Sequence, residues 1–105
     1  MIDGRESWPE PRDLVMAYWQ ARTTKNYDEM AIYWPGSATW NSKAFEKEEP
    51  VEYVFGKVQA AKSEDYVVVP YASKNYFHEQ RKYSLKMVLS NRKSAKKRYY
   101  IVSGN

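Results

Sequence analysis

The sequence predicts an α+β domain in which N-terminal helices pack on a curved, mainly antiparallel β-sheet. Two observations carry this prediction. Apolar residues recur with the helical period in residues 11–34, and they alternate with the period of two that is typical of strands through much of residues 51–103. A run of helices followed by a run of strands favours helices gathered on one face of an antiparallel sheet.

The chain has 105 residues, and we expect one domain made of an extended tail (1–10), a helical part (11–49) and a β-sheet part (50–105). A domain of this length can bury one core without covalent staples. The chain has no cysteine, which excludes disulfides and thiolate metal sites. It also has no apolar stretch long enough for a transmembrane helix and no signal-peptide core near Met1, so we expect a cytoplasmic protein.

Two helices are predicted at the start of the chain. The first begins at Pro11, a residue suited to a first helical turn, and ends near residues 23–24. Its apolar stripe has the spacing i, i+3, i+4, i+7 and consists of Leu14, Ala17, Tyr18 and Ala21. The second helix spans residues 27–33, with Asn26 as its N-cap and Pro35-Gly36 as its stop.

The segment between the second helix and the sheet carries weaker signals. Residues 38–40 are expected to be extended. Asn41 or Ser42 is expected to cap a further helical turn over residues 43–49, which Pro50 ends.

Strand patterns begin at residue 51. Residues 51–59 alternate as one strand, residues 62–65 form a turn, and residues 66–72 form a strand in which Pro70 predicts an edge or bulged position. Residues 73–75 fit either a turn or a bulge, and residues 76–80 continue as extended chain.

Residues 83–90 give the clearest strand. The side chains expected to face the core are Tyr83, Leu85, Met87 and Leu89, and those expected to face outward are Ser84, Lys86 and Ser90. Residues 98–103 form the last predicted strand. Its apolar residues fall on both faces, so we expect both faces to be covered.

Three features follow one another along the chain: an opening helix (Pro11, 14–15, 18–19), a polar break with a second helix start (26–29), and a closing strand (100–104). In this order the chain resembles the nuclear-transport-factor-2-like superfamily, also called cystatin-like cone folds. The resemblance implies a bent sheet that wraps the first helix, a cavity at the open end of the cone, and dimers that pair their sheets. The chain departs from the family in its short middle, because only about 16 residues separate Trp34 from Val51. Members have many activities, so the fold alone does not supply a function.

Aromatic residues are dense, with four Trp, ten Tyr and three Phe. Tyr and Trp combine a large apolar body with a polar tip and suit half-wet pockets. We expect a small non-catalytic domain that binds an apolar or aromatic ligand, or a protein partner, and forms a homodimer through the sheet. The predicted ligand-binding residues flank the space between helix and sheet: Tyr18, Trp34, Trp40, Tyr53, Tyr71, Tyr76 and His78.

The first alternative is a small proton-transfer or hydrolytic enzyme. This enzyme would use a pocket histidine or tyrosine. His78 is the only histidine and the candidate base, and it shares a strand face with Tyr76, whereas Glu79 points the opposite way. One histidine and no cysteine exclude the usual zinc sites, and the four glycines lie too far apart for a phosphate loop. We therefore expect no metal and no cofactor.

The second alternative is a basic module that binds nucleic acid or another anionic partner. The net charge of +4 is uneven: residues 80–105 carry eight Lys or Arg and no acid. The candidate residues form a loop between two predicted strands: Arg92, Lys93, Lys96, Lys97 and Arg98. The same lysines could instead be solvated residues that protect a strand edge from pairing.

Overall fold

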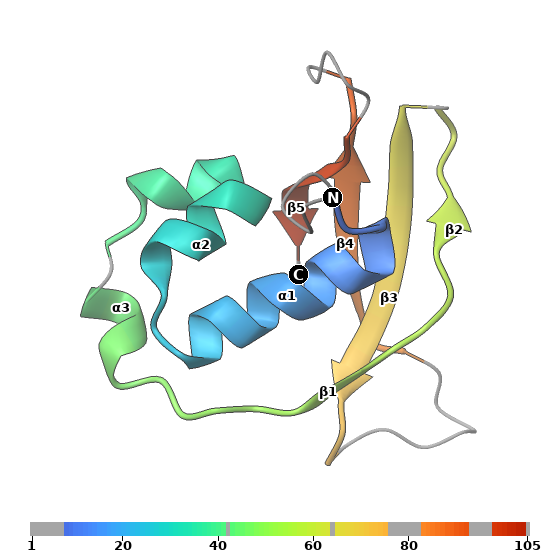
Figure 1. Ribbon diagram of the computed structural model, residues 1–105. Coiled ribbons are helices and arrows are strands. Elements are labelled where there is room, and N and C mark those ends of the chain that lie inside the picture. Colours follow the sequence, from blue (N-terminus) through green and yellow to red (C-terminus); the bar gives the residue numbers. More distant parts are fainter. Residues whose placement is uncertain (1–7, 42, 64, 76–82, 93–97, 105) are drawn as a thin grey trace, which may run out of the picture.

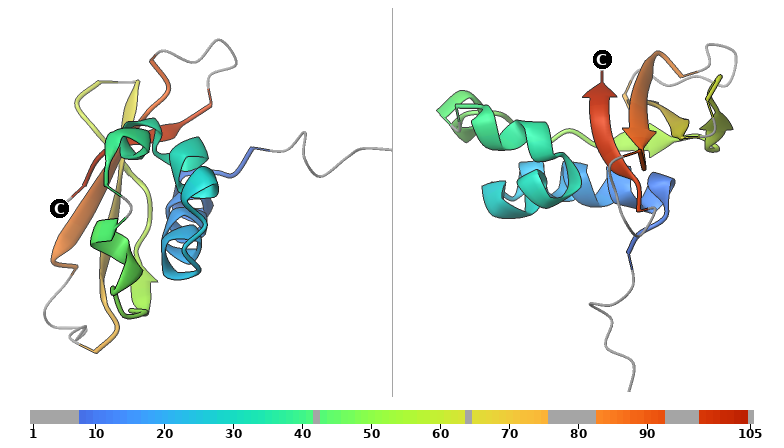
Figure 2. Two further views of the ribbon diagram at one scale, coloured as in Figure 1. Left: turned by 90° about the vertical axis from the view of Figure 1, so that its left-hand side faces the viewer. Right: turned by 90° about the horizontal axis from the view of Figure 1, so that it is seen from above.

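The computed structural model describes residues 8–41, 43–63, 65–75, 83–92 and 98–104, which form two layers (Figure 1). Three α-helices and a 3-10 helix pack with a five-stranded antiparallel sheet. Turned by 90°, the molecule shows the long helix α1 on one side and the strands on the other (Figure 2). The predicted α+β class is confirmed, whereas the cone shape stays a prediction.

Helix α1 (Pro11–Thr23) is the helix on which the sheet packs, and its bounds confirm the prediction. Leu14, Val15 and Tyr18 are fully buried because the helical period places them on one stripe. Beyond the C-cap residue Thr24, Lys25 adopts a left-handed backbone with φ of 63°. Ahead of the helix, the indole Nε1 of Trp8 donates a hydrogen bond of 2.7 Å to the carbonyl of Tyr99.

Helix α2 (Tyr27–Tyr33) also confirms its prediction. The side chain of Asn26 accepts a hydrogen bond from the amide of Glu29, and Met30 is buried against the core. The chain then turns through a 3-10 helix (Pro35–Thr39), so the expectation of extended chain over residues 38–40 is wrong for Ala38 and Thr39. The reason is local bonding, because the amides of Ser37 and Trp40 bond to carbonyls three residues earlier.

Helix α3 (Lys43–Glu46) is shorter than the predicted residues 43–49. The Asn41 side chain accepts a hydrogen bond from the amide of Lys43, which confirms a cap at the predicted place. Beyond the helix, the ammonium of Lys25 binds the carbonyls of Phe45 and Glu48. These bonds join the segment that follows α1 to α3 and to the residues just beyond it.

The sheet is built around its longest strand. Strands β1 (Tyr53–Phe55) and β2 (Gln59–Ala60) both pair with β3 (Tyr66–Ser73), which pairs with β4 (Leu85–Ser90), and β4 pairs with β5 (Tyr100–Gly104). All pairs are antiparallel. None of the described helices has both the length and the apolar character needed to cross a membrane.

Pro70 lies in β3, an interior strand, so the predicted edge position is wrong, whereas the alternative of a bulged position agrees with the change of register beside it. Residues 51–59 form two short strands rather than one. Pro70 lacks an amide hydrogen, and its carbonyl accepts a hydrogen bond of 2.8 Å from the amide of Gly56. In a strand, the amide and carbonyl of one residue point to the same side. The missing donor therefore faces the break between β1 and β2, where the register shifts by one residue.

The core lies between α1 and one face of the sheet. Met87 and Leu89 are buried as predicted, and Ile101 of β5 is buried with them. Ser90 was expected to point to solvent but is only 2% exposed, because it pairs with two flanking tyrosines, Tyr66 and Tyr100, in the register of the sheet. Both faces of the last strand were expected to be covered, yet Val102 is 39% exposed, so the outer face of β5 is open within this chain.

The close approach at Gly56 gives a first prediction. A Cβ atom at this position would lie 2.7 Å from the Tyr83 ring and 2.9 Å from Pro70. We expect Gly56→Ala to lower the free energy of unfolding by about 1–3 kcal/mol, because one of these rings must move. At Gly36 the nearest atom would lie at 3.4 Å, so Gly36→Ala should leave stability unchanged or raise it by up to about 1 kcal/mol.

Urea unfolding followed by circular dichroism compares the two variants. Equal stability of Gly56→Ala and the parent protein would contradict this packing of Tyr83 on β1.

Candidate functional site

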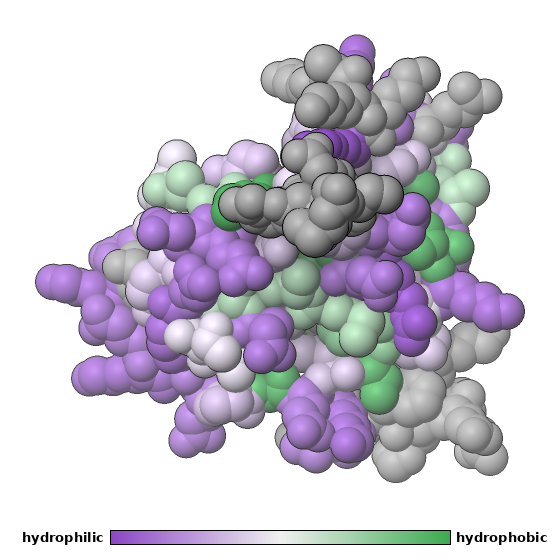
Figure 3. All heavy atoms as spheres, in the orientation of Figure 1, coloured by the Kyte–Doolittle hydropathy of each residue, from purple (hydrophilic) through white to green (hydrophobic). Residues whose placement is uncertain are grey.

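A groove runs between α1 and residues 50–55. Its volume is about 560 Å³. Four residues of one helical face line one side, and they follow the spacing of consecutive turns: Met16, Trp19, Gln20 and Thr23. The other side is residues 50–55, with Lys74 at its rim. In the space-filling view, small apolar areas reach the surface among hydrophilic residues below α1, where β1 passes in Figure 1 (Figure 3).

Trp19 is the centre of the aromatic cluster in this groove. Its ring lies 4.6 Å from the ring of Tyr53, 5.4 Å from Tyr18 and 5.9 Å from Tyr71, measured between centroids. Tyr53 also contacts Phe55 and Tyr71. The indole nitrogen of Trp19 is buried without a hydrogen-bond partner among the described residues. Rings that contact one another in this way form a stiff apolar wall.

Two arginines of α1 bond to the chain that forms the far side of the groove. At one end, Arg12 donates a hydrogen bond of 3.2 Å to the carbonyl of Phe55. At the other end, Arg22 forms a bidentate ion pair with Glu48, with both N···O distances at 2.7 Å. Residues 48–55 therefore run alongside α1 in the opposite direction, and the groove lies between the two arginines.

The Arg22 side chain is only 19% exposed and has several partners besides Glu48. Its Nη1 donates to the hydroxyl of Tyr18 at 3.2 Å. Its guanidinium lies 4.5 Å from the ring centroid of Phe45 and 4.8 Å from that of Trp19. A planar guanidinium can stack on rings and bind a carboxylate in a bidentate manner at once, which a lysine cannot do.

These contacts determine the charges around the groove. Hydrogen bonds from Arg22 lower the pKa of Glu48, so this carboxylate is ionised at neutral pH. Burial tends to lower the pKa of Arg22, but the bonds to Glu48 and Tyr18 outweigh it and raise the pKa. Burial raises the pKa of Tyr18 and Tyr53, and it raises the pKa of Tyr71 to about 12. The three phenols therefore keep their protons at neutral pH.

A smaller cavity of about 140 Å³ adjoins the groove. Arg22, Glu48 and Glu49 line it, and it shares Trp19, Val51 and other lining residues with the groove. The groove thus extends from an apolar middle to a charged end, where Arg22 and Glu48 are paired.

The structure brings together only some of the predicted ligand-binding residues. Tyr18, Tyr53 and Tyr71 meet around Trp19. Trp34 and Trp40 lie beyond Tyr18, since Trp34 is 5.4 Å from Tyr18 and 4.8 Å from Trp40. Trp34 there packs against β5, where a Cβ atom at Gly104 would lie 3.2 Å from its ring.

Tyr76 and His78 lie outside the described residues. His78 as a base therefore stays a prediction.

Of the residues that line the groove, only Tyr53 was predicted from the sequence. Those missed include Trp19 at the centre of the aromatic cluster and, at the opening and the charged end, Met16, Val51, Arg22 and Glu48. The ion pair joins residues 26 positions apart, a separation that no local pattern predicts. One signal was available. Arg22 follows Tyr18 by four residues, so the helix places the guanidinium beside that aromatic ring.

The predicted basic residues are described only in part. Arg92 is exposed and lines a cavity of about 450 Å³ on the outer face of the sheet, together with Tyr66, Tyr100 and others. The guanidinium of Arg98 lies 5.4 Å from the ring centroid of Trp8. Lys93, Lys96 and Lys97 lie outside the described residues, so the anion-binding role of this loop stays a prediction.

Within the described ranges, no group of three His, Cys, Asp or Glu residues could hold a metal ion. Comparison of the chain with protein-family models, with curated proteins and with solved structures finds no match. The resemblance to the nuclear-transport-factor-2-like superfamily therefore stays a prediction.

The ion pair gives a second prediction. We expect Glu48→Gln to lower the free energy of unfolding by about 1–3 kcal/mol, because a mostly buried guanidinium loses its counter-charge. Glu52 forms an ion pair of 3.1 Å with Lys74 at the surface, where both side chains are largely exposed. Glu52→Gln is the matched control and should cost less than about 0.5 kcal/mol.

The lowered pKa of Glu48 also determines how the stability difference between the parent protein and Glu48→Gln changes with pH. The pKa of Glu48 is lowered in the folded protein, so its contribution is complete above the unfolded value of about 4.3. That contribution is lost as the pH falls through the folded pKa. The stability difference between the parent and Glu48→Gln should therefore shrink in acid, and a constant difference would contradict the ion pair.

Proposed function

We propose that this protein is a small non-catalytic binding domain whose groove between α1 and residues 50–55 takes a ligand with an apolar or aromatic body. The observation that best supports this proposal is a groove of about 560 Å³ with one wall of contacting aromatic rings. This volume lies in the range of protein ligand pockets. The apolar residues Met16 and Val51 are exposed at its opening and would be covered by such a ligand.

Hydrogen bonds from α1 to both ends of the far wall support a binding role. Arg22 bonds to Glu48 and Tyr18, and Arg12 bonds to the carbonyl of Phe55, so both ends of the far wall are held. A preformed wall loses little conformational entropy on binding, and more of the contact energy then appears as affinity.

The charges around the groove favour binding over proton transfer. A general acid or base works best with a pKa near the working pH. Among the groups with shifted values here, the pKa of Glu48 moves down and those of the tyrosines move up, away from neutrality. Glu48 is moreover already engaged by Arg22 on both oxygens.

A second surface supports a homodimer through the outer face of the sheet. Tyr66, Tyr100 and Val102 line the cavity there, and Val102 remains 39% exposed. Aromatic and aliphatic side chains on an open sheet face are the composition expected at the centre of a protein interface.

The groove gives a third prediction, tested with anilinonaphthalene sulfonate and indole as probes. We expect both to bind the parent protein and to shift the amide NMR signals of Gln20 and Thr23. Val51→Lys should weaken the binding of indole about fivefold or more, because it places a charge beside an apolar ligand. Val51 is 42% exposed, so the fold should tolerate the change.

Ile32→Lys is the matched control, because Ile32 is an apolar residue of α2 that is 54% exposed and does not line the groove. No binding to the parent, or an equal loss in Ile32→Lys, would refute the groove as the binding site.

The sheet face gives a fourth prediction. Analytical ultracentrifugation of the parent protein should show a dimer, and Val102→Lys should shift the equilibrium towards monomer because a charge would enter an apolar contact. Ile32→Lys again serves as the control. A parent protein that stays monomeric at its highest soluble concentration would refute the dimer.

A further inference from the structure

Strand β1 is an edge strand, and its unpaired edge faces the groove. The sheet order places β1 at one end, with β3 as its partner on the other side. The hydrogen bond from Arg12 of α1 to the carbonyl of Phe55 shows that this free edge is turned towards α1. The groove is therefore bounded on one side by a helix and on the other by the edge of a sheet.

The register identifies which backbone groups lie along this edge. The amide of Lys74 bonds to the carbonyl of Glu52, and the amide of Gly56 bonds to the carbonyl of Pro70. Backbone groups alternate in direction along a strand, so residues 52, 54 and 56 point at β3. Those of Tyr53 and Phe55 then point the other way, into the groove.

Among the described residues, three of these four groups lack a protein partner. The carbonyl of Phe55 accepts from Arg12, but within the described chain the amides of Tyr53 and Phe55 and the carbonyl of Tyr53 have no hydrogen bond to protein. Donor and acceptor groups spaced along a strand edge match the backbone of another extended chain. A small aromatic compound could fill the apolar space but could not match this row.

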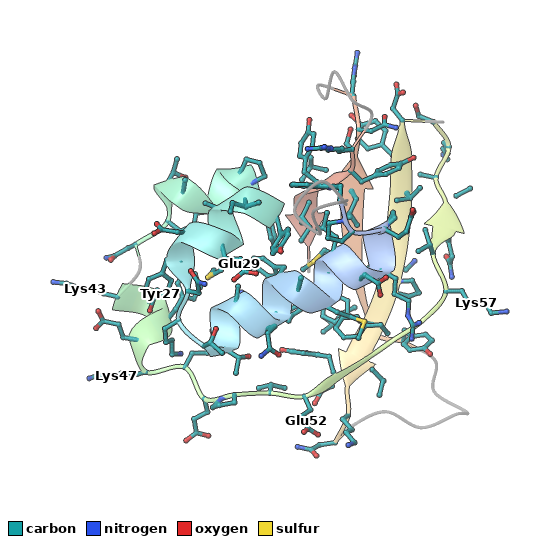
Figure 4. The ribbon with its side chains drawn as sticks, in the orientation of Figure 1. Tyr27, Glu29, Lys43, Lys47, Glu52 and Lys57 are labelled. Atoms are coloured by element: carbon teal, nitrogen blue, oxygen red, sulfur yellow. The ribbon has the colours of Figure 1, made fainter. Side chains whose placement is uncertain are left out.

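The side chains around the edge select the kind of chain that fits. Glu52 and Lys57 flank β1 and point away from the sheet (Figure 4). Glu52 is paired with Lys74, so these two charges offset each other. Met16 and Trp19 line the groove, where they would contact every second side chain of an added strand. The partner that matches is an extended chain with apolar residues at alternate positions and uncharged residues at the positions in between.

We infer that the groove binds an extended peptide of a partner protein, which adds as a strand to the free edge of β1 and inserts alternate apolar side chains against Met16 and Trp19. This inference rests on the proposed function of the groove and names the class of its ligand. The backbone of the peptide supplies affinity through the edge of β1, and the alternating side chains supply selectivity.

The test uses a library of short acetylated and amidated peptides in which every second residue is Val, Ile, Leu, Phe, Tyr or Trp and the others are Ser, Thr or Gly. We expect the best binders to shift the NMR signals of the Tyr53 and Phe55 amides and to slow their hydrogen exchange. Val51→Lys should weaken these peptides, and Ile32→Lys should not.

N-methylation of the peptide provides the matched control. Alternate amides of an added strand face β1, so methylation of that set should weaken binding about tenfold or more. Methylation of the other set, which faces away, should have little effect. Equal effects of the two sets would overturn the inference, because they would show that the backbone does not pair with β1.

The remaining outcomes separate the inference from the proposed function. If no peptide binds while anilinonaphthalene sulfonate and indole do, the peptide inference fails and the groove remains a small-molecule site. If neither kind of probe binds, both fail. If the Tyr53 and Phe55 amides are protected without peptide in a dimeric protein, a second copy of the chain occupies the edge and the inference is overturned.

Discussion

The interaction of Arg22 with Glu48 organises the side of the molecule that carries the groove. The guanidinium is mostly buried, and it is held between a carboxylate, a tyrosine hydroxyl and the rings of Trp19 and Phe45. A charge in such a place is tolerated only when it is paired and hydrogen-bonded. Because Arg22 belongs to α1 and Glu48 precedes the sheet, satisfying this charge places residues 48–55 beside the helix.

A second constraint determines where the edge of the sheet is left open. Pro70 has no amide hydrogen to give to a neighbouring strand, and Gly56 comes close enough to bond to its carbonyl. The chain that pairs with β3 is therefore divided into two strands, β1 and β2, at this point. The short strand β1 keeps its side chains in the aromatic cluster and turns its unpaired backbone groups towards α1.

The two faces of the sheet have different characters. The face towards α1 buries Val69, Tyr71 and Met87 in the core. The outer face carries Tyr66, Tyr100 and Val102 around a cavity with Arg92 at its side. The groove and the outer face of the sheet are thus separate surfaces, and a partner on one leaves the other accessible.

The sequence by itself determined the class of the fold and the bounds of α1 and α2, because helical periodicity, a proline at the first turn and an asparagine cap are local signals. It also predicted the inward positions Met87 and Leu89 of β4. It identified Tyr18, Tyr53 and Tyr71 as neighbours of the space between helix and sheet, since aromatic residues on facing elements must meet there.

Only the tertiary structure decided the rest. The pairing of Arg22 with Glu48, the interior position of Pro70, the burial of Ser90 between two tyrosines and the direction of the β1 edge all depend on the register of distant segments. Each is a contact between residues far apart in the chain. Local patterns carry no information about such contacts, because their energies appear only once the helix and the strands have packed together.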